Sequence, residues 1–289
     1  MLPDRTMPLG ASPSPFAIPV LSRSFGSWRL SLDRTPFDQD ALAEHYDTTA
    51  NRWHDIIDRH GFGAAYQSLI AAVLSEPPYR QDSGSLRVLD AGVGTGAMSS
   101  AFCAEVRKRI RLDAVDISAA MLQEAKDRLA HEDVDLSLKR ASLANLPYAD
   151  NSFDVVLAAH VIEHLPNPQL ALDEIHRVLK PGGILICSVT KASLIGGYVQ
   201  LIWRTHRVSQ SSALKWLRRC GLGAVRAIPF DRQSSAGWFS IGYVGKKAER
   251  VKEGLTDKPS ARSPGRRQRA ARPHSRTHAD ASRCCRRAP

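Results

Sequence analysis

Residues 87–96 read Arg-Val-Leu-Asp-Ala-Gly-Val-Gly-Thr-Gly, and this stretch decides the fold of the chain. Val88 and Leu89 are typical of a buried parallel strand, and three alternating glycines follow where the chain must turn and leave room for a ligand. Ala97 to Arg107 then reads as a helix. A strand, a glycine turn and a helix in this order place backbone N–H groups and a positive helix end beside a bound group. The stretch therefore predicts a site for a nucleotide-type cofactor.

The glycine spacing by itself leaves two classes of cofactor open. Gly92, Gly94 and Ala97 also satisfy the looser G-x-G-x-x-A pattern of dinucleotide-binding folds. The acid at Asp90 separates the two classes, because a fixed carboxylate repels a pyrophosphate and attracts a cofactor that carries an ammonium and a sulfonium. A nicotinamide-dependent oxidoreductase therefore remains an alternative that Asp90 argues against.

A second acid follows the next apolar strand, which runs from Leu112 to Val115. Asp116 ends this strand and stands 20 residues beyond Gly96. From this place a carboxylate accepts hydrogen bonds from ribose hydroxyls. The role suits either class of cofactor.

Further segments continue the pattern in a fixed order. They are Asp113 to Leu122, Leu146 to Val156, His160 to Leu165, and Arg177 to Leu185. With these segments the chain resembles the class I S-adenosylmethionine-dependent methyltransferases, particularly the group that includes the ubiquinone and menaquinone C-methyltransferases. The resemblance covers roughly residues 38 to 247, and its closest part lies between Leu86 and Val189.

The resemblance implies a fold and a cofactor. The expected fold is α/β and Rossmann-like: a seven-stranded, mostly parallel sheet with an antiparallel last strand, helices on both faces and an N-terminal helical cap. The expected cofactor is S-adenosyl-L-methionine. The residues expected to bind its parts are Asp90, Gly92, Gly94 and Gly96 for the methionine part, Asp116 for the ribose, Ile117, Ser142 and Leu143 around the adenine, and Tyr46 from the cap.

One of these positions departs from the family pattern. Ser142 stands where many relatives have an acid that holds the adenine amino group. A hydroxyl still accepts a hydrogen bond, although a neutral acceptor is the weaker partner. Tyr46 also has an alternative interpretation, as a packing residue of an amphipathic cap helix from Asp38 to His60. Its ring would otherwise favour the sulfonium through cation–π attraction.

The segment His160 to His164 has the spacing H-x-x-E-H, which is also the signature of a class of metal peptidases. That chemistry requires a helix, whereas here the segment follows the strand Phe153 to Ala158 and runs into Pro166 and Pro168. We therefore expect no metal. Ligands of open α/β sheets bind at the carboxyl ends of the strands, so His160 is the candidate catalytic residue and general base. Alternatively it only lines the pocket, since a sulfonium is an activated donor and positioning alone supplies much of the catalysis.

Composition predicts one catalytic domain with loose ends. The expected division is a flexible arm at 1–36, a methyltransferase domain at 37–247 and a disordered basic tail at 248–289. The domain itself divides into a cap at 37–80, a cofactor-binding core at 86–190, substrate-lid helices at 191–219 and the last strands at 220–247. The residues from Lys246 onward carry +10 of the net charge of +11.

The expected acceptor of the methyl group is a small molecule, hydrophobic or lipid-like in character. Apolar residues in the lid segment, followed by Arg204, His206 and Arg207, would also suit contact with a membrane surface. The basic tail leaves a nucleic-acid methyltransferase as an alternative, but it holds no aromatic residue to stack on bases. A cofactor-binding subunit without activity is a further alternative. No stretch is apolar enough to span a bilayer, and a cytoplasmic location is expected.

Overall fold

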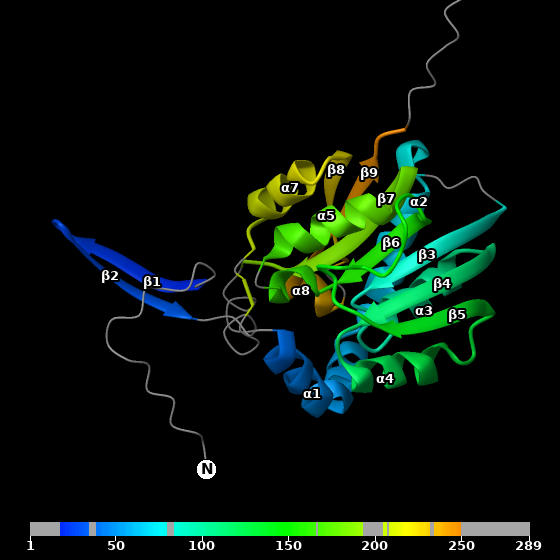
Figure 1. Cartoon of the computed structure of the whole chain (residues 1–289), viewed down its shortest axis with the longest axis horizontal. Coiled ribbons are helices and arrows are strands. Elements are labelled where there is room, and N and C mark those ends of the chain that lie inside the picture. Colours follow the sequence, from blue (N-terminus) through cyan, green and yellow to red (C-terminus); the bar gives the residue numbers. More distant parts are fainter. Residues whose placement is uncertain are drawn as a thin grey trace, which may run out of the picture. The chain divides into compact units, whose positions relative to one another are not determined.

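The computed structural model describes most of the chain between the arm and the tail (Figure 1). The described residues are 18–34, 39–79, 84–165, 167–192, 205–206, 208–231 and 234–249. Nearly all of the predicted basic tail, from residue 250 onward, lies outside them, and so does 193–204 of the predicted lid.

Helices and strands alternate through most of this part of the chain. The strands are β1 (Ile18–Phe25), β2 (Trp28–Arg34), β3 (Ser85–Ala91), β4 (Arg109–Asp116), β5 (Val134–Arg140), β6 (Phe153–Ala159), β7 (Leu179–Thr190), β8 (Leu222–Pro229) and β9 (Ser240–Lys247). The helices are α1 (Gln39–Arg59), α2 (Phe62–Leu74), α3 (Ala97–Glu105), α4 (Ala119–Leu129), α5 (Pro168–Val178), α7 (Gln210–Arg219) and the single turn α8 (Ala236–Phe239). Two short 3-10 helices, η1 (Pro77–Tyr79) and η2 (Ile162–His164), complete the set.

Seven of the strands form one sheet in the order β5-β4-β3-β6-β7-β9-β8. β9 is antiparallel to both of its neighbours, and the pairs among β5, β4, β3, β6 and β7 are parallel. The predicted sheet with an antiparallel last strand is confirmed. The strand order reverses direction between β3 and β6, and open α/β sheets bind ligands at the carboxyl ends of strands beside such a reversal.

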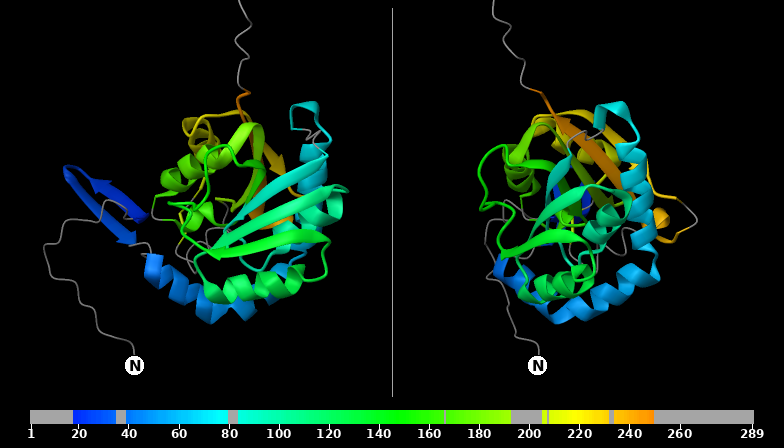
Figure 2. Two further views of the ribbon diagram at one scale, coloured as in Figure 1. Left: turned by 45° about the vertical axis from the view of Figure 1, so that its right-hand side comes forward. Right: turned by 90° about the vertical axis from the view of Figure 1, so that its right-hand side faces the viewer.

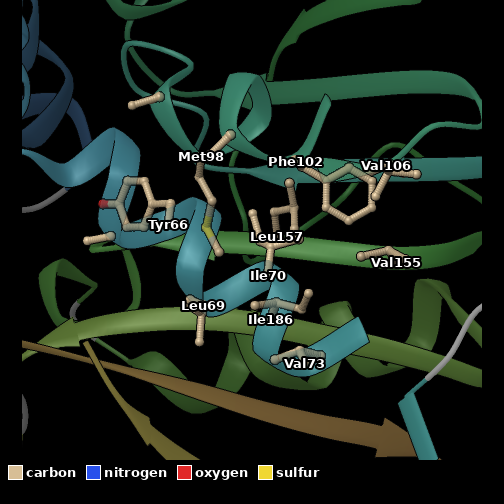
Figure 3. Close-up of a cluster of buried hydrophobic side chains, with 14 of the residues drawn as sticks. Tyr66, Leu69, Ile70, Val73, Met98, Phe102, Val106, Val155, Leu157 and Ile186 are labelled. Atoms are coloured by element: carbon tan, nitrogen blue, oxygen red, sulfur yellow. The ribbon is translucent and has the colours of Figure 1, made fainter. Parts of the chain in front are cut away.

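Helices cover both faces of this sheet (Figure 2). Side chains along β7 alternate between the two faces of the sheet. Ile184 and Ile186 pack in the hydrophobic core on one face, and Leu185 and Cys187 pack in the core on the other face. The first core contains side chains of α2 and α3, and Figure 3 shows Leu69, Ile70 and Val73 of α2 packed against it. The second core contains side chains of α5 and α7. Burial of these apolar side chains is the main source of the fold's stability.

The predicted helical cap is confirmed and contains two helices, of which the first lies close to its predicted limits of Asp38 to His60. α1 spans Gln39–Arg59 and α2 spans Phe62–Leu74. Gly61 joins them with φ +70°, a left-handed conformation that glycine adopts without strain. α1 runs beside α4 in both views of Figure 2. None of the described helices is long and apolar enough to cross a bilayer.

Regular structure departs from the prediction in a few places. Residues 18–34 of the predicted flexible arm form an antiparallel hairpin, β1 with β2, around a two-residue turn that begins at Gly26 with φ +60°. Pro19, the one proline among these described residues, pairs with Asp33 near the start of β1. Within 220–247, where the last strands are predicted, the single turn α8 (Ala236–Phe239) separates β8 from β9, which begins at Ser240.

Lys247 closes the end of α5 and should contribute more to stability than its neighbour. Its Nζ donates to His176 O at 2.7 Å, Leu179 O at 2.8 Å and Asn151 Oδ1 at 3.0 Å. A cation at a helix C-terminus satisfies the last carbonyls and the helix dipole. We expect Lys247→Met to lower the free energy of unfolding by about 2–4 kcal/mol, because charged hydrogen bonds are lost and their acceptors stay partly buried.

Urea unfolding of both variants measures this effect. Lys246→Met is the matched control, because Lys246 pairs with Glu249, which is 72% exposed. Such a surface pair is worth roughly 0–1 kcal/mol. Equal losses in the two variants would contradict the role of Lys247 as the cap of α5.

Candidate cofactor site

The three glycines of the loop after β3 all have left-handed backbone conformations, with φ +81° at Gly92, +51° at Gly94 and +77° at Gly96. They differ in what surrounds them. A Cβ at Gly92 would lie 2.5 Å from Val161 Cγ2, and one at Gly96 would lie 3.3 Å from Ala125 Cα. A Cβ at Gly94 would meet no atom within 4 Å. Two of the glycines therefore allow close packing, and the middle one faces open space.

Asp116 fixes the glycine loop to the end of β4. Its Oδ2 accepts a hydrogen bond from Gly94 N at 2.9 Å, and its Oδ1 accepts one from Ser118 N at 3.0 Å. Burial raises the pKa of Asp116 above its usual range, although these backbone hydrogen bonds oppose the shift. Each oxygen keeps a further lone pair for a ligand, so the carboxylate is both anchored and available.

Asp90 lies behind the loop and not on the surface of the pocket. It is 1% exposed, and its Oδ2 accepts a hydrogen bond from Ser99 Oγ at 2.6 Å. Its Oδ1 is buried with no hydrogen-bond partner among the described residues. Burial, together with the negative charge of Asp116 and against the hydrogen bond from Ser99, raises the pKa of Asp90 to about 7. A nearby cation would restore the ionised form.

His160 begins the loop after β6 with φ +50°, an uncommon conformation for a residue with a side chain. Its Nδ1 lies 3.2 Å from Glu163 Oε1, and its Nε2 is buried without a hydrogen-bond partner in the described structure. The prediction that no helix continues through His160 to His164 is confirmed, since Ile162–His164 form only the short 3-10 helix η2 and α5 begins separately at Pro168. Proline at the first position of a helix is favourable, so this residue starts α5 and does not merely prevent a helix.

The cap helix α1 is tied to the sheet on two sides of the glycine loop. On one side Tyr46 Oη lies 2.9 Å from His164 Nδ1. On the other side Asp47 Oδ1 accepts hydrogen bonds from Ser118 Oγ at 2.5 Å and Ala120 N at 3.2 Å. Asp47 therefore binds the N-terminus of α4, which begins just after Asp116, and it holds helix α1 beside the carboxyl end of β4.

These elements enclose one pocket, which brings together most of the predicted site residues. Tyr46, Gly92, Gly94, Asp116, Ile117, Ser142, Leu143 and His160 all line it. Asp90 and Gly96 do not, since they lie behind the loop. The hydroxyl of Ser142 accepts a hydrogen bond from Ala144 N at 3.2 Å, which shapes the turn after β5.

Sequence reasoning missed several residues of the pocket wall. They are Leu42, Trp53, Met121, Ala159, Val161 and Leu165, and His164 of the H-x-x-E-H motif also lies in the wall. Leu165 directly follows the H-x-x-E-H motif. Its closeness to His160 in the sequence was the signal that could have placed it in the pocket wall. The predicted lid contributes nothing to this wall within its described part. There α7 buries Ala213 and Leu217 in the core.

The wall of the pocket suits a cationic nucleoside better than a dinucleotide. Among its described residues there is a carboxylate, Asp116, and there are two aromatic rings, Tyr46 and Trp53, but no Lys or Arg. A pyrophosphate would lack a cationic partner there, whereas a sulfonium would gain from the carboxylate and the aromatic faces. The open space at Gly94 and the unpartnered oxygen of Asp90 are further features that fit S-adenosylmethionine.

Comparison with known sequences agrees with this geometry. Residues 89–187 match a family model described as a methyltransferase domain. The chain is 40% identical over 103 residues to the ubiquinone/menaquinone biosynthesis C-methyltransferase UbiE of Hydrogenovibrio crunogenus, which covers 34% of this chain and 40% of that protein. It is 36% identical over 110 residues to the demethylmenaquinone methyltransferase of Lactiplantibacillus plantarum, which covers 37% and 46%. The chain thus matches less than half the length of these relatives.

Solved structures share the fold at low sequence identity. The magnesium protoporphyrin IX methyltransferase from Synechocystis PCC 6803, with bound SAH, superposes with a TM-score of 0.56 and 18% identity over 73% of this chain and all of that one. The [4+2]-cyclase SpnF gives a TM-score of 0.56 and 18% identity over 74% and 98%. Residues 89–187, which hold the glycine loop and the central strands of the sheet, thus match a methyltransferase domain, and these solved structures share the fold.

Proposed function

We propose that this chain transfers a methyl group from S-adenosylmethionine to a small, apolar acceptor. The observation that carries the proposal is the single pocket at the carboxyl ends of β3, β4 and β6. It brings Asp116, Tyr46 and His160 together around the glycine loop from three separate parts of the sequence. The bound cofactor supplies an electrophilic methyl group on a sulfonium, and this chemistry needs positioning more than it needs activation.

Each part of the cofactor has a candidate partner in this pocket. We assign the ribose hydroxyls to Asp116, whose carboxylate is already fixed by Gly94 and Ser118. Ile117, Ser142 and Leu143 provide the largely apolar surroundings of the adenine. The backbone at Gly94 leaves room for the methionine part, and Gly92 lines the same pocket. Asp90 attracts its ammonium from behind the loop.

The acceptor side of the proposal rests on the chemistry of the remaining wall. Leu42, Trp53 and Leu165 present apolar surface, and His160 is the polar group beside them. Such a wall favours a hydrophobic ring over a sugar-phosphate chain. The named relatives act in ubiquinone and menaquinone biosynthesis, so a quinol-like ring is the acceptor class that we propose to test first.

One structural neighbour argues for testing binding and transfer separately. The [4+2]-cyclase SpnF has the same fold, and a fold does not determine the reaction that its site performs. A protein of this kind could bind the cofactor and transfer nothing. We therefore separate the two questions experimentally.

Isothermal titration of the full chain with S-adenosylmethionine, S-adenosylhomocysteine and NADH answers the first question. We expect binding of the first two and no binding of NADH. The second question is answered by following tritium from the labelled methyl group into an organic extract of reduced naphthoquinols and benzoquinols, with tRNA and duplex DNA as parallel acceptors. Binding of NADH alone would overturn the cofactor assignment, and label in nucleic acid only would overturn the small-molecule acceptor.

Binding of S-adenosylmethionine should depend on pH through Asp90. In the ligand-free protein the pKa of Asp90 is about 7, so below pH 7 this carboxyl is mostly protonated. It must lose a proton to pair with the ammonium, and the free energy needed for this falls as the pH rises. We expect the affinity to increase between pH 5.5 and pH 7, by at most about tenfold per pH unit, with release of a proton.

Titrations in two buffers of different ionisation enthalpy measure the released proton directly. Asp90→Asn is the control, because the amide is similar in size and cannot titrate. We expect this variant to bind more weakly at pH 7 and to release no proton from this position. A wild-type affinity that stays constant between pH 5.5 and pH 7 would contradict the role of Asp90.

A further inference from the structure

A buried carboxylate lies directly behind the candidate catalytic histidine. Glu163 is 0% exposed, and its Oε1 lies 3.0 Å from Thr190 N, 3.2 Å from Thr190 Oγ1 and 3.2 Å from His160 Nδ1. The Thr190 N–H group can only donate, and an ionised carboxylate can only accept. Oε1 is therefore the acceptor in these contacts, and β7 holds it in place through the backbone of Thr190.

Glu163 stays ionised in spite of its burial. Burial raises the pKa of this carboxyl, but the hydrogen bond and charge of His160 and the backbone N–H group of Thr190 oppose burial and bring the pKa below its usual value. Since Glu163 carries no proton of its own, the proton between it and His160 belongs to Nδ1. In the neutral imidazole this leaves the lone pair at Nε2.

The ring of His160 is held from several sides in this arrangement. Its backbone, with φ +50°, is held by a hydrogen bond from its N–H group to Ser188 O at 2.9 Å. Phe62 of α2 packs edge-to-face against the ring at 5.2 Å between centroids. Nε2 is buried and has no hydrogen-bond partner among the described residues, in a residue that lines the pocket. A buried acceptor of this kind is costly unless a ligand uses it.

His164, the other histidine of the pocket wall, is unsuited to the same task. Its Nδ1 is engaged with the hydroxyl of Tyr46 at 2.9 Å. Burial, with the neighbouring histidines adding to it and Glu163 opposing it, lowers the pKa of His164 to about 4. It therefore remains neutral and is a weak base at neutral pH.

We infer that Glu163 is a positioning residue, which holds His160 with its proton on Nδ1 so that Nε2 accepts the proton that the methyl acceptor gives up. The inference rests on the proposed function. In the balanced step a bond forms between the acceptor and the methyl carbon, the carbon–sulfur bond breaks with its electron pair left on sulfur, and the acceptor's proton moves to Nε2. Glu163 then faces an imidazolium, which it stabilises until the proton passes to solvent.

Nitrogen-15 NMR of the histidine side chains tests the inference without any acceptor. The full chain is labelled at its histidine ring nitrogens, and His160→Gln assigns the signals of His160. In the wild type we expect a protonated Nδ1 and an unprotonated Nε2 at neutral pH. A wild-type His160 that carries its proton on Nε2 overturns the inference, and this result does not depend on whether any variant folds.

Two variants test the part played by Glu163. Glu163→Gln removes the charge, and we expect His160 to change to a mixture of tautomers. Thr190→Val is the matched control, because it removes the hydroxyl that lies 3.2 Å from the same oxygen and 3.4 Å from His160 Nδ1 but leaves the carboxylate, so the tautomer should stay as in the wild type if the carboxylate sets it. An unchanged tautomer in a folded Glu163→Gln protein would contradict the positioning role.

Kinetics then separate this inference from the proposed function. With an acceptor that the wild type methylates, we expect Glu163→Gln to lower kcat by about 10–100-fold, a part of what a general base contributes. The Kd for S-adenosylmethionine should change less than twofold. The double variant Glu163→Gln/His160→Gln should lose no more than His160→Gln alone. Failure of the wild type to transfer methyl defeats the proposed function, whereas full kcat in Glu163→Gln defeats only the inference.

Discussion

Asp116→Asn is expected to weaken the binding of S-adenosylmethionine by about 10–150-fold. The carboxylate is proposed to accept hydrogen bonds from the ribose, and hydrogen bonds to a charged group contribute about 1.5–3 kcal/mol. An amide also presents NH2 where an oxygen now accepts from Gly94 N or Ser118 N. Either orientation of the new amide opposes an N–H group, so the glycine loop loses an anchor together with the ligand contact.

Isothermal titration with S-adenosylmethionine and S-adenosylhomocysteine measures the effect. Asp154→Asn is the matched control, because Asp154 is also mostly buried and charge-paired but lies at the start of β6. There it accepts hydrogen bonds from Arg87 N at 2.9 Å and Lys180 Nζ at 2.8 Å. We expect this control to lose stability and to keep the wild-type affinity. An Asp116→Asn protein that folds and binds as well as the wild type would remove Asp116 from the cofactor site.

The prediction for Asp116 was accessible from sequence because it depends on local order. A strand followed by a carboxylate puts that side chain at the carboxyl end of the strand, and the glycine loop of the preceding strand reaches the same edge of a parallel sheet. The same reasoning correctly brings Gly94, Ile117 and His160 to one pocket. The seven-stranded sheet itself followed from the resemblance to the family, since only some strands, such as β6, are nearly continuous apolar runs.

What the sequence could not predict depends on partners that are distant along the chain. Tyr46 meets His164 across 118 residues, and Glu163 meets Thr190 across 27. These contacts require the relative placement of α1, β6 and β7, which no local pattern specifies. Asp90 was misplaced for a different reason. It lies close to Gly92 in the sequence, but its burial behind the loop depends on how α3 packs, since Ser99 of α3 donates a hydrogen bond to it.

The hairpin at 18–34 was missed because proline was given too much weight. The turn at Gly26 and the alternating residues around it predict a hairpin by turn chemistry. A proline has no N–H group to donate to a neighbouring strand, but the residues that follow it can still form strand hydrogen bonds. Within the described residues Pro19 leaves Leu21 to Leu32 free to pair.

Gly92→Ala and Gly94→Ala should impair different properties, although the two residues lie close together in one loop. We expect the first to reduce mainly the stability of the fold and the second to reduce mainly the binding of S-adenosylmethionine. Both have positive φ, so each alanine costs about 1–2 kcal/mol of backbone strain. At Gly92 the added Cβ would also lie 2.5 Å from Val161 Cγ2 and 2.9 Å from Val161 Cβ. Overpacking of this kind costs about 1–3 kcal/mol more. We therefore expect Gly92→Ala to lower the free energy of unfolding by about 2–5 kcal/mol.

At Gly94 the added Cβ meets no protein atom within 4 Å, so only the backbone strain should reduce stability. Gly94 lines the pocket, however, and the proposed cofactor would occupy the space that the methyl group enters. We expect Gly94→Ala to bind S-adenosylmethionine at least tenfold more weakly, with a smaller loss of stability than Gly92→Ala. Urea unfolding and isothermal titration of both variants measure the contrast.

A second substitution at Val161 identifies the cause at Gly92. Val161→Ala removes both Cγ atoms that crowd the new Cβ, so it should recover part of the stability lost in Gly92→Ala and none of the affinity lost in Gly94→Ala. If both alanines instead cost equal stability and leave binding intact, the glycines serve only the turn. The contrast that we expect would mean that Gly92 is needed for packing against the loop of His160, and that Gly94 is needed for the ligand.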